Sequence, residues 1–280
     1  MKNRVFQVEA PAPLLDYLRQ KLPGEGRNKV KGLLSRGQVR INGRTETAFD
    51  AALSPGDRVE LLAQAPVRYP MKVLYEDEKL LAVEKPAGLL AVPTPTDRRS
   101  ALTRLQAALE ERGSRVRLQA LHRLDKDTSG VLVFTKDPAL RERLQQNWSD
   151  AALLRRYTAL VQGAPPREAG TVRTRFRENR AHQVYSGAEG REAVTRYRVL
   201  RRGEAWSLVE VELDTGRKNQ IRVHMSELGC PVAGDRKYGG EAGPLGRLGL
   251  HADTLHLRLP DGQVLRLSAP APRAFMEAVR

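Results

Sequence analysis

Cysteine is almost absent from this sequence, since Cys230 is the only one in 280 residues. A single thiol excludes an internal disulfide and any metal cluster built from several cysteines. The five histidines do not fall into an HExxH pattern or a comparable ligand spacing. We therefore expect neither a disulfide-stabilised fold nor a metal held by the protein.

Long apolar runs are also missing. No segment approaches the roughly 18 apolar residues of a membrane-spanning helix, and the N-terminal sequence MKNRVFQVEA lacks the uninterrupted apolar core of a signal peptide. No basic amphipathic helix with an aromatic face stands out, so a membrane surface is a weaker candidate partner than nucleic acid. We expect the protein to stay in the cytoplasm and to bind no membrane.

Acidic residues are scarce relative to basic ones. The chain has 33 Asp and Glu against 48 Lys and Arg, which gives a formal net charge of +15 and a pI near 10.3. An excess of positive charge this large attracts polyanions. With 40% hydrophobic residues the chain is long enough to bury a core, and its length favours one large and one smaller domain.

The sequence pattern divides the chain into three parts. Residues 1–63 contain two short segments with helical spacing of leucine and valine, followed by short strand segments, and are expected to form a small domain. Residues 64–70 contain two prolines and are expected to be a linker. Strand patterns in residues 71–280 show the alternation of antiparallel sheets, so we predict an α+β fold with a mixed, mainly antiparallel sheet.

The small domain carries a run of basic residues. Between Arg27 and Arg44 there are six basic residues and no acidic one. The run spans a helix predicted at residues 28–35 and a hairpin turn predicted at Asn42-Gly43. A solvated face explains such a run as well as an RNA-binding surface does. The six residues are Arg27, Lys29, Lys31, Arg36, Arg40 and Arg44.

The large domain contains a crowded polar stretch that runs directly into an apolar strand. Residues 122–130 precede a strand predicted at Val131–Thr135, with Thr-Ser-Gly expected to be the tight turn between them. Asp125 is therefore expected in a loop at the edge of a sheet, where a cation such as Arg123 would keep it ionised for use as a nucleophile or general base. The alternative is that Asp125 and Asp127 only cap turns.

The segment HRLD followed by TSG, at residues 122–130, resembles the signature of the RluA-type pseudouridine synthases. Other motifs of that family occur in the family's order along the chain, and the matching segments run from residue 85 to residue 252, so the resemblance extends over most of the large domain. Several separated motifs in order are far more specific than one. These segments are KPAG at 85–88, RRYTALV at 155–161, GRKNQIR at 216–222, GDRKYGG at 234–240 and LGLHA at 248–252.

The resemblance implies a role for several side chains. Asp125 corresponds to the catalytic aspartate, and Tyr157 to a tyrosine that stacks on the target base and is a candidate to accept its proton. Arg222 stands where the family has a basic residue that forms a salt bridge with the aspartate, in a geometry that suits bidentate contact. Arg123 would enter the RNA stack where the target nucleotide leaves. The chain departs from the family at Lys218-Asn219, where Thr-His is commoner.

The small domain resembles the S-four-like RNA-binding module of ribosomal proteins and tyrosyl-tRNA synthetases, on the segments SRGQVRING and SPGDRVEL. This resemblance implies that the second helix and the turn after it present the six basic residues to RNA phosphates. The two resemblances together imply structured RNA as the partner, with large-subunit ribosomal RNA favoured over transfer RNA. A monomer is the default expectation.

The reaction implied by the resemblance detaches uracil from its ribose, turns it and rejoins it through ring carbon five. No electrons leave and no atom is added, so we expect no cofactor. The target base must leave its helix, at a cost of a few kcal/mol that stacking and pocket hydrogen bonds offset. Asp125 either attacks the anomeric carbon or removes the 2′ proton of the sugar, and the sequence does not choose between the two.

Two other functions compete with this interpretation. A non-enzymatic RNA-binding or ribosome-assembly protein would explain the charge and the small domain, but not the presence of Asp125, Tyr157 and Arg222 in the order of the family motifs. A glycoside hydrolase could pair Asp125 with Asp127 or Asp137. An aromatic content of 5% and the positive charge both argue against a neutral sugar substrate.

Overall fold

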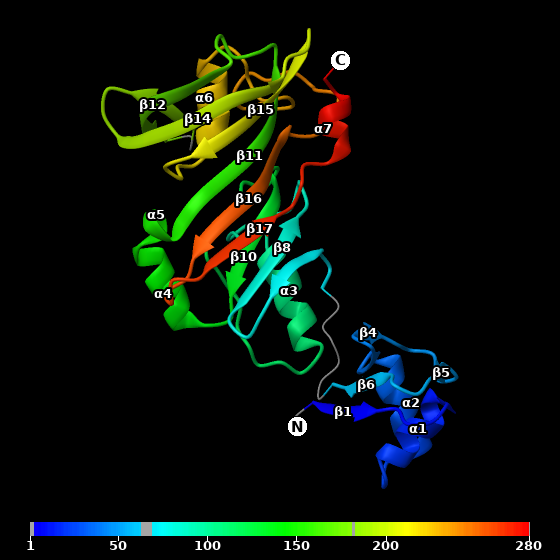
Figure 1. Ribbon diagram of the computed structural model, residues 1–280. Helices are drawn as coiled ribbons and strands as arrows, with labels where there is room; N and C mark the ends of the chain where they lie inside the picture. The colour runs from blue at the N-terminus through cyan, green and yellow to red at the C-terminus, as the bar shows by residue number, and fades with distance from the viewer. Residues whose placement is uncertain (1–2, 63–68, 181–182, 280) are drawn as a thin grey trace. The chain divides into compact units, whose positions relative to one another are not determined.

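The computed structural model describes residues 3–62, 69–180 and 183–279, and Figure 1 shows their arrangement. The chain divides into two compact units, one of Met1–Arg68 with Glu111–Gly113 and one of Tyr69–Glu110 with Ser114–Arg280. The linker predicted at residues 64–70 lies, up to residue 68, outside the described residues. No helix among the described residues is long and apolar enough to cross a membrane.

The small unit packs two short helices against a four-stranded sheet of order β1-β6-β3-β4. Its core is formed by the apolar faces of both helices and the inner face of the sheet, including Leu14, Leu18, Val30 and Val39. Asn42 and Gly43 have φ angles of 50° and 80°, as the predicted hairpin turn requires. The elements are β1 Arg4–Gln7, β2 Ala12–Pro13, α1 Leu14–Lys21, α2 Arg27–Ser35, β3 Val39–Ile41, β4 Arg44–Thr45, β5 Ala52–Leu53 and β6 Arg58–Leu61.

The large unit is built on an 11-stranded sheet with the main order β13-β12-β14-β15-β11-β16-β10-β8-β7, to which β9 and β17 are added beside β10 and β16. Its strands are β7 Val73–Glu76, β8 Leu80–Lys85, β9 Gln119–Ala120, β10 Ser129–Thr135, β11 Ala152–Gln162, β12 Ala169–Glu178, β13 Val184–Gly187, β14 Arg191–Arg201, β15 Trp206–Leu213, β16 Leu250–Arg258 and β17 Val264–Ser268. Its helices are α3 Ala101–Glu110, α4 Pro138–Gln146, α5 Trp148–Ala151, α6 Gln220–Glu227 and α7 Arg273–Glu277.

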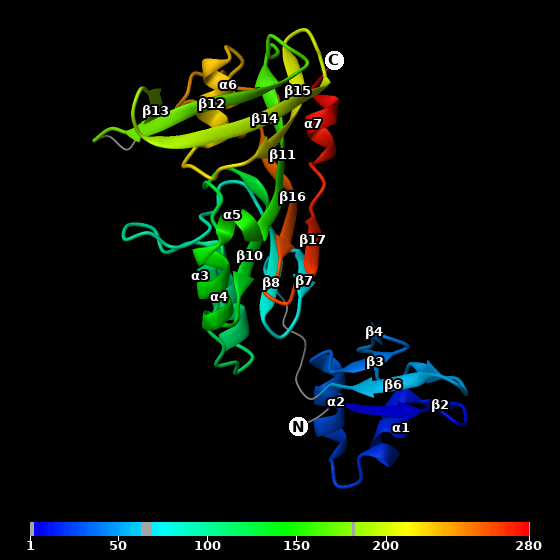
Figure 2. The same ribbon diagram turned by 60° about the vertical axis from the view of Figure 1, so that its left-hand side comes forward.

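All the paired strands of this sheet are antiparallel except β10 and β16, so the predicted mixed, mainly antiparallel α+β fold is confirmed. Two of the apolar cores of the large unit join the sheet to its helices. One joins β10 and β16 to α4 and α5, and the other joins β11, β14 and β15 to α6. Figures 1 and 2 show α6 beside the β12-β14 half of the sheet and α4 beside β10. Every residue of β10 is buried, as expected for a strand whose middle, residues 131–134, is a continuous apolar run.

The predicted turn at Thr-Ser-Gly is wrong in detail, because Ser129 and Gly130 already belong to β10. Gly130 has a φ of 116°, and a Cβ there would lie 2.1 Å from the carbonyl oxygen of Ala252 on the parallel strand β16. No residue with a side chain fits so close to a neighbouring backbone. The turn instead falls at Lys126-Asp127, just after Asp125, and this leaves Asp125 in the loop between β9 and β10.

Candidate active site

Asp125 lies where this loop faces the start of α6. Its carboxylate accepts a 2.6 Å hydrogen bond from the side-chain amide of Asn219 and lies 3.5 Å from Nη1 of Arg222. Both contacts are made by the same oxygen, Oδ2. Among the described residues neither oxygen accepts a hydrogen bond from the backbone of the adjacent turn, so Asp125 does not act as the turn cap that the sequence left as an alternative. Its side chain remains 29% exposed.

The contact predicted between Arg222 and Asp125 is present, but its expected bidentate geometry is not. The bidentate partner of Arg222 is Asp235, with Nε to Oδ2 and Nη2 to Oδ1 both at 2.7 Å. Asp235 is fully buried, and it also accepts hydrogen bonds from the backbone N–H groups of Lys237 and Tyr238. Burial acts to lower the pKa of Arg222, but the hydrogen bonds and charge of Asp235 outweigh it and raise that pKa.

Asn219 contacts Asp125 but was not predicted from the sequence to be a functional residue. It precedes α6 with a left-handed φ of 54°, a conformation that Asn tolerates better than most residues. Its side-chain oxygen accepts a 3.1 Å hydrogen bond from the hydroxyl of Tyr238, which turns the amide nitrogen toward Asp125. The departure from the family pattern at this position was the available signal.

Replacing Asn219 by Gly is expected to lower kcat by about tenfold and to leave the Kd for RNA nearly unchanged, because one hydrogen bond to the carboxylate is lost. Glycine accepts the left-handed backbone without strain, so the change isolates the side chain. Asn42→Gly is the matched control, because Asn42 also has a positive φ, of 50°, but lies in the small unit. An unchanged kcat for Asn219→Gly would show that the amide does not position Asp125.

Tyr157 lies on β11 and lines the same recess as Asp125. Burial raises the pKa of its phenol to about 12, although the positive charge of Arg155 acts in the opposite direction. The hydroxyl is therefore protonated at neutral pH. In this state the ring is available for stacking, and the hydroxyl is a hydrogen-bond donor and a weak base.

His122 is not suited to act as a general base. Its Nε2 accepts a 3.2 Å hydrogen bond from the backbone N–H of Val133, and its ring stacks on Trp148 with 5.4 Å between the centroids. Burial, and secondarily the charge of Arg155, lowers the pKa of His122 to about 4, so the ring is neutral. Because Nε2 already accepts a backbone hydrogen bond, His122 fixes the loop against the sheet.

The second carboxylate of a glycoside hydrolase is not in place. Asp137 accepts hydrogen bonds from the backbone N–H groups of Ala139 and Leu140 and caps the N-terminus of α4. Asp127 is exposed in the turn after Asp125 and does not line the cleft described below. Among the described residues, Asp125 is therefore the only carboxylate that lines this cleft.

A cleft of about 1030 Å³ is lined in part by Asp125, and a smaller recess of about 70 Å³ adjoins it, lined by Asp125, Tyr157, Asn219 and Arg222 among others. Six cationic side chains line the cleft, against the single carboxylate of Asp125. A low-dielectric cleft with this balance of charge concentrates anions. The six cations are Arg123, Lys126, Arg141, Arg155, Arg217 and Lys218.

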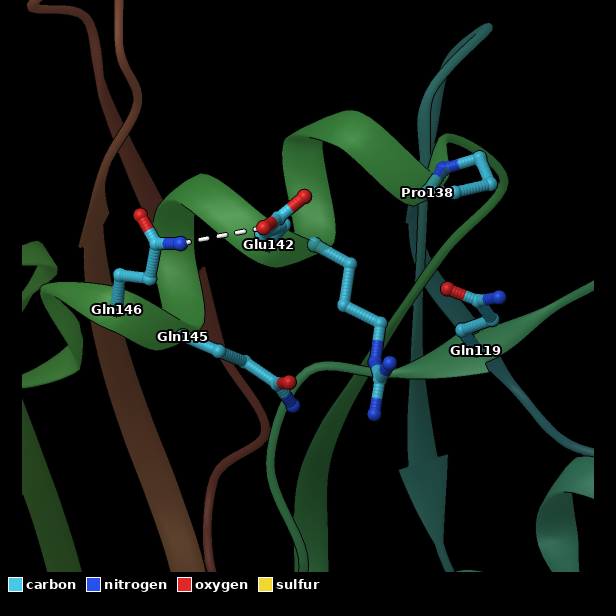
Figure 3. A pocket seen from close by; sticks show the side chains of 6 residues that line it. Gln119, Pro138, Glu142, Gln145 and Gln146 are labelled. Atoms are coloured by element: carbon cyan, nitrogen blue, oxygen red, sulfur yellow. Dashed lines mark hydrogen bonds between the residues drawn. The ribbon is translucent and has the colours of Figure 1, made fainter.

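A second, open hollow of about 510 Å³ lies beside α4, and Figure 3 shows the side chains that line it. Gln119 and Gln145 line both this hollow and the cleft, so the two are neighbours on the surface. The one acid of the hollow, Glu142, accepts a 3.2 Å hydrogen bond from Gln146 on the next turn of α4. The hollow is thus a polar surface next to the cleft, and it has no acid–base pair of its own among the described residues.

Lys85, the first residue of the KPAG segment, is completely buried and forms a hydrogen bond to the loop that carries Asp125. Its ammonium group donates to the carbonyl oxygens of Pro86, Leu89 and Lys126, at 2.7–2.9 Å. Burial lowers the pKa of Lys85 to about 8, while Asp127 and Asp125 act to raise it. The contact to Lys126 fixes the residue that directly follows Asp125.

The six basic residues of the small unit are not equivalent. Lys29 forms a salt bridge of 2.6 Å with Glu25, Lys31 lies 4.6 Å from the ring centroid of Phe49, and Arg36 donates to the side chain of Gln38. Arg27 and Arg44 are exposed, and the Nε atom of half-buried Arg40 has no acceptor among the described residues. Their contact with RNA stays a prediction.

Comparison with known proteins gives consistent matches. Residues 79–227 match the family model of RNA pseudouridylate synthases. A Chlorobaculum parvum protein described as an uncharacterized RNA pseudouridine synthase is 33% identical, over 96% of this chain and 93% of that protein. A ribosomal large subunit pseudouridine synthase D from Xanthomonas campestris is 32% identical, over 94% and 87%. The structure of human RNA pseudouridylate synthase domain containing 4 is 27% identical with a TM-score of 0.60, over 74% of this chain and 91% of that one.

Proposed function

The chain belongs to the RNA pseudouridylate synthase family, as a member of the RluA type that isomerises uridine in RNA to pseudouridine, and on this premise we propose that Asp125 is its catalytic residue. One observation carries the proposal. Asp125 is the only carboxylate, in the described part of the chain, that lines a cleft with six cationic side chains.

The two contacts of Asp125 suit it for attack on the ribose. Asn219 and Arg222 both approach Oδ2, so Oδ1 accepts no hydrogen bond from the described residues. A carboxylate held by one oxygen presents the other in a fixed direction, which is the requirement for a nucleophile or a general base. Attack on the anomeric carbon and removal of the 2′ proton both place Oδ1 at the sugar.

The target nucleotide has to reach Asp125 outside its helix, since the sugar and ring edge are inaccessible within a stack. We expect the extruded base to stack on Tyr157 in the recess. Arg123 is exposed at the same place and is expected to fill the gap left in the RNA. Flipping costs a few kcal/mol, which favours loops and bulges as targets.

Replacing Tyr157 by Phe is expected to reduce kcat by less than about tenfold, because the protonated phenol of Tyr157 is a poor acceptor for the ring proton and the aromatic ring remains. Tyr157→Ala should lower kcat/KM by more, since stacking on a base contributes about 1–3 kcal/mol. Single-turnover rates of both variants separate the two roles. A fall of about 10² to 10⁴ for Tyr157→Phe, the usual size of acid–base catalysis, would assign proton transfer to the hydroxyl.

We propose large-subunit ribosomal RNA as the substrate, in the cytoplasm, because several similar proteins are ribosomal large subunit pseudouridine synthases D. The small unit, with its exposed Arg27, Arg36 and Arg44, is proposed to bind RNA phosphates in the manner of an S-four-like module. Mapping pseudouridines by chemical blocking and primer extension, in cells with and without the gene, tests the substrate. Loss of a site in transfer RNA alone would contradict this assignment.

A further inference from the structure

Arg155 is a buried cation in the cleft that the proposed mechanism does not use. It lies on β11 two positions before Tyr157, so both side chains leave the same face of the strand. Only 9% of its surface is exposed, and it lines the cleft together with Tyr157, Gly216 and Arg217. A buried guanidinium at a substrate cleft requires an explanation, because burying an unpaired charge is costly.

The described part of the protein leaves Arg155 without an anionic partner. One nitrogen, Nη2, donates to the carbonyl oxygen of Asp214 at 2.8 Å. Its Nε atom is buried and has no hydrogen-bond acceptor among the described residues. The carboxylate of Asp214 instead binds Arg196 at 2.7 Å. The charge of Arg155 is therefore neutralised by no carboxylate within ion-pair distance in the described residues.

A second cation, Arg217, adds to the positive charge that no carboxylate of the described residues neutralises. Arg217 also lines the cleft, and its Nε donates to a backbone carbonyl oxygen, that of Glu192, at 2.9 Å. Burial lowers the pKa of Arg155, Tyr157 and the more distant charge of Asp214 act to raise it, and the positive charge of Arg217 acts to lower it. Two guanidinium groups placed together without a carboxylate are typical of a site that takes up an anion from outside.

Gly216 allows the guanidinium of Arg155 to lie close to the backbone at the wall of the cleft. A Cβ at Gly216 would lie 2.8 Å from Nη1 of Arg155, so any side chain at this position would push the guanidinium away. Gly216 is itself exposed and lines the cleft. Because Gly216 has no side chain, Nη1 of Arg155 lies against the backbone of a residue that lines the cleft.

We propose that Arg155, with Arg217 beside it, binds the phosphodiester that joins the target nucleotide to its neighbour in the RNA. Uracil and ribose carry no charge, whereas RNA carries one negative charge at every phosphate, and the planar guanidinium matches two phosphate oxygens. This inference rests on the proposed function, because it assumes that RNA enters the cleft toward Asp125. Arg155 would then position the sugar by holding its phosphate.

The test combines a protein change with an RNA change. Arg155→Gln is compared with the wild type on RNA oligonucleotides that carry the target uridine and a neutral methylphosphonate at its 5′ or 3′ linkage. We expect one of the two replacements to weaken binding and kcat/KM of the wild type by about 10- to 100-fold, the effect of a charge-assisted hydrogen bond. On normal RNA, the kcat/KM of Arg155→Gln should be lower than that of the wild type by a similar factor. The methylphosphonate at that linkage should reduce the kcat/KM of Arg155→Gln little further.

Arg156→Gln is the matched control. Arg156 is adjacent in sequence but points to the other face of the sheet, where it is paired with Glu210 at 3.3 Å and Glu212 at 2.8 Å. This variant should keep the full sensitivity to the methylphosphonate. Gly216→Ala, which displaces the guanidinium and keeps its charge, should behave like Arg155→Gln and serves as the second variant if that protein does not fold.

Two results would overturn the proposal. In the first, the loss of kcat/KM caused by Arg155→Gln multiplies with the loss caused by the methylphosphonate at both the 5′ and the 3′ linkage, which would show that Arg155 contacts neither phosphate. In the second, kcat/KM is unchanged in both Arg155→Gln and Gly216→Ala, which would show the same. The same comparison by Kd in an Asp125→Asn background does not depend on turnover. Failure of the catalytic proposal would appear instead as undiminished activity of Asp125→Asn, so the two failures are distinguishable.

Discussion

Asp125→Asn is expected to abolish pseudouridine formation, with a fall in kcat of at least about 10⁴-fold, the upper range for loss of a general base or nucleophile. Asparagine keeps the shape of the side chain and still offers an oxygen to Asn219 and Arg222, so the fold should persist. RNA binding should be retained, because the change removes the only carboxylate that lines the cleft in the described part of the chain. Tritium release from RNA labelled at ring carbon five measures turnover.

The control for this experiment is Asp127→Asn, which makes the same chemical change two residues later in an exposed turn. Its kcat should remain close to that of the wild type. Tritium release by Asp125→Asn at a measurable fraction of the wild-type rate would exclude Asp125 as the catalytic residue. Loss of activity in both variants would point instead to the conformation of the turn.

Asp235→Asn is expected to have the largest effect on stability. Asp235 is fully buried and holds Arg222 through two hydrogen bonds of 2.7 Å, and the side chain of Arg222 is only 12% exposed. An amide cannot accept both hydrogen bonds, and breaking a buried ion pair leaves an unpaired charge at a cost of about 3–5 kcal/mol. Urea unfolding measures the free energy, and kcat should fall as well, because Arg222 is no longer fixed beside Asp125.

Glu212→Gln is the control for Asp235→Asn. Glu212 pairs with Arg156 at 2.8 Å, and about a third of each side chain is exposed to solvent, 30% and 36%, so the pair is far less buried than that of Asp235 and Arg222. Exposed ion pairs contribute about 0–1 kcal/mol, so this variant should unfold at nearly the wild-type urea concentration. A free energy of unfolding for Asp235→Asn equal to that of the wild type would show that the pair with Arg222 does not stabilise the fold.

The elements that sequence patterns predicted well are those with strong local periodicity. The second helix was predicted at residues 28–35 and is found at Arg27–Ser35, and the buried strand predicted at Val131–Thr135 is found at Ser129–Thr135. The short strand β13, at Val184–Gly187, was not predicted. It is a four-residue strand at the edge of the sheet, and its pairing with β12 is not encoded in its own pattern.

The candidate site was predicted in part. The HRLD segment identified Asp125 as the candidate nucleophile or base, and the structure brings Tyr157 and Arg222 to the same recess. Their catalytic roles remain predictions. The partner of Arg222 was not foreseen, because a sequence motif indicates that an arginine is present but not which of several carboxylates it binds.

The sequence by itself determined the excess of positive charge, the alternation that specifies an antiparallel sheet, and the order of the motifs, because each of these is a property of residue type and local spacing. Only the tertiary structure decided that Asn219 holds Asp125 across 94 residues of chain, that Asp235 takes the guanidinium of Arg222, and that Arg155 is buried without a carboxylate. Such contacts depend on which strands and loops become neighbours when the chain folds. The local spacing of residue types does not indicate which distant segments will come into contact.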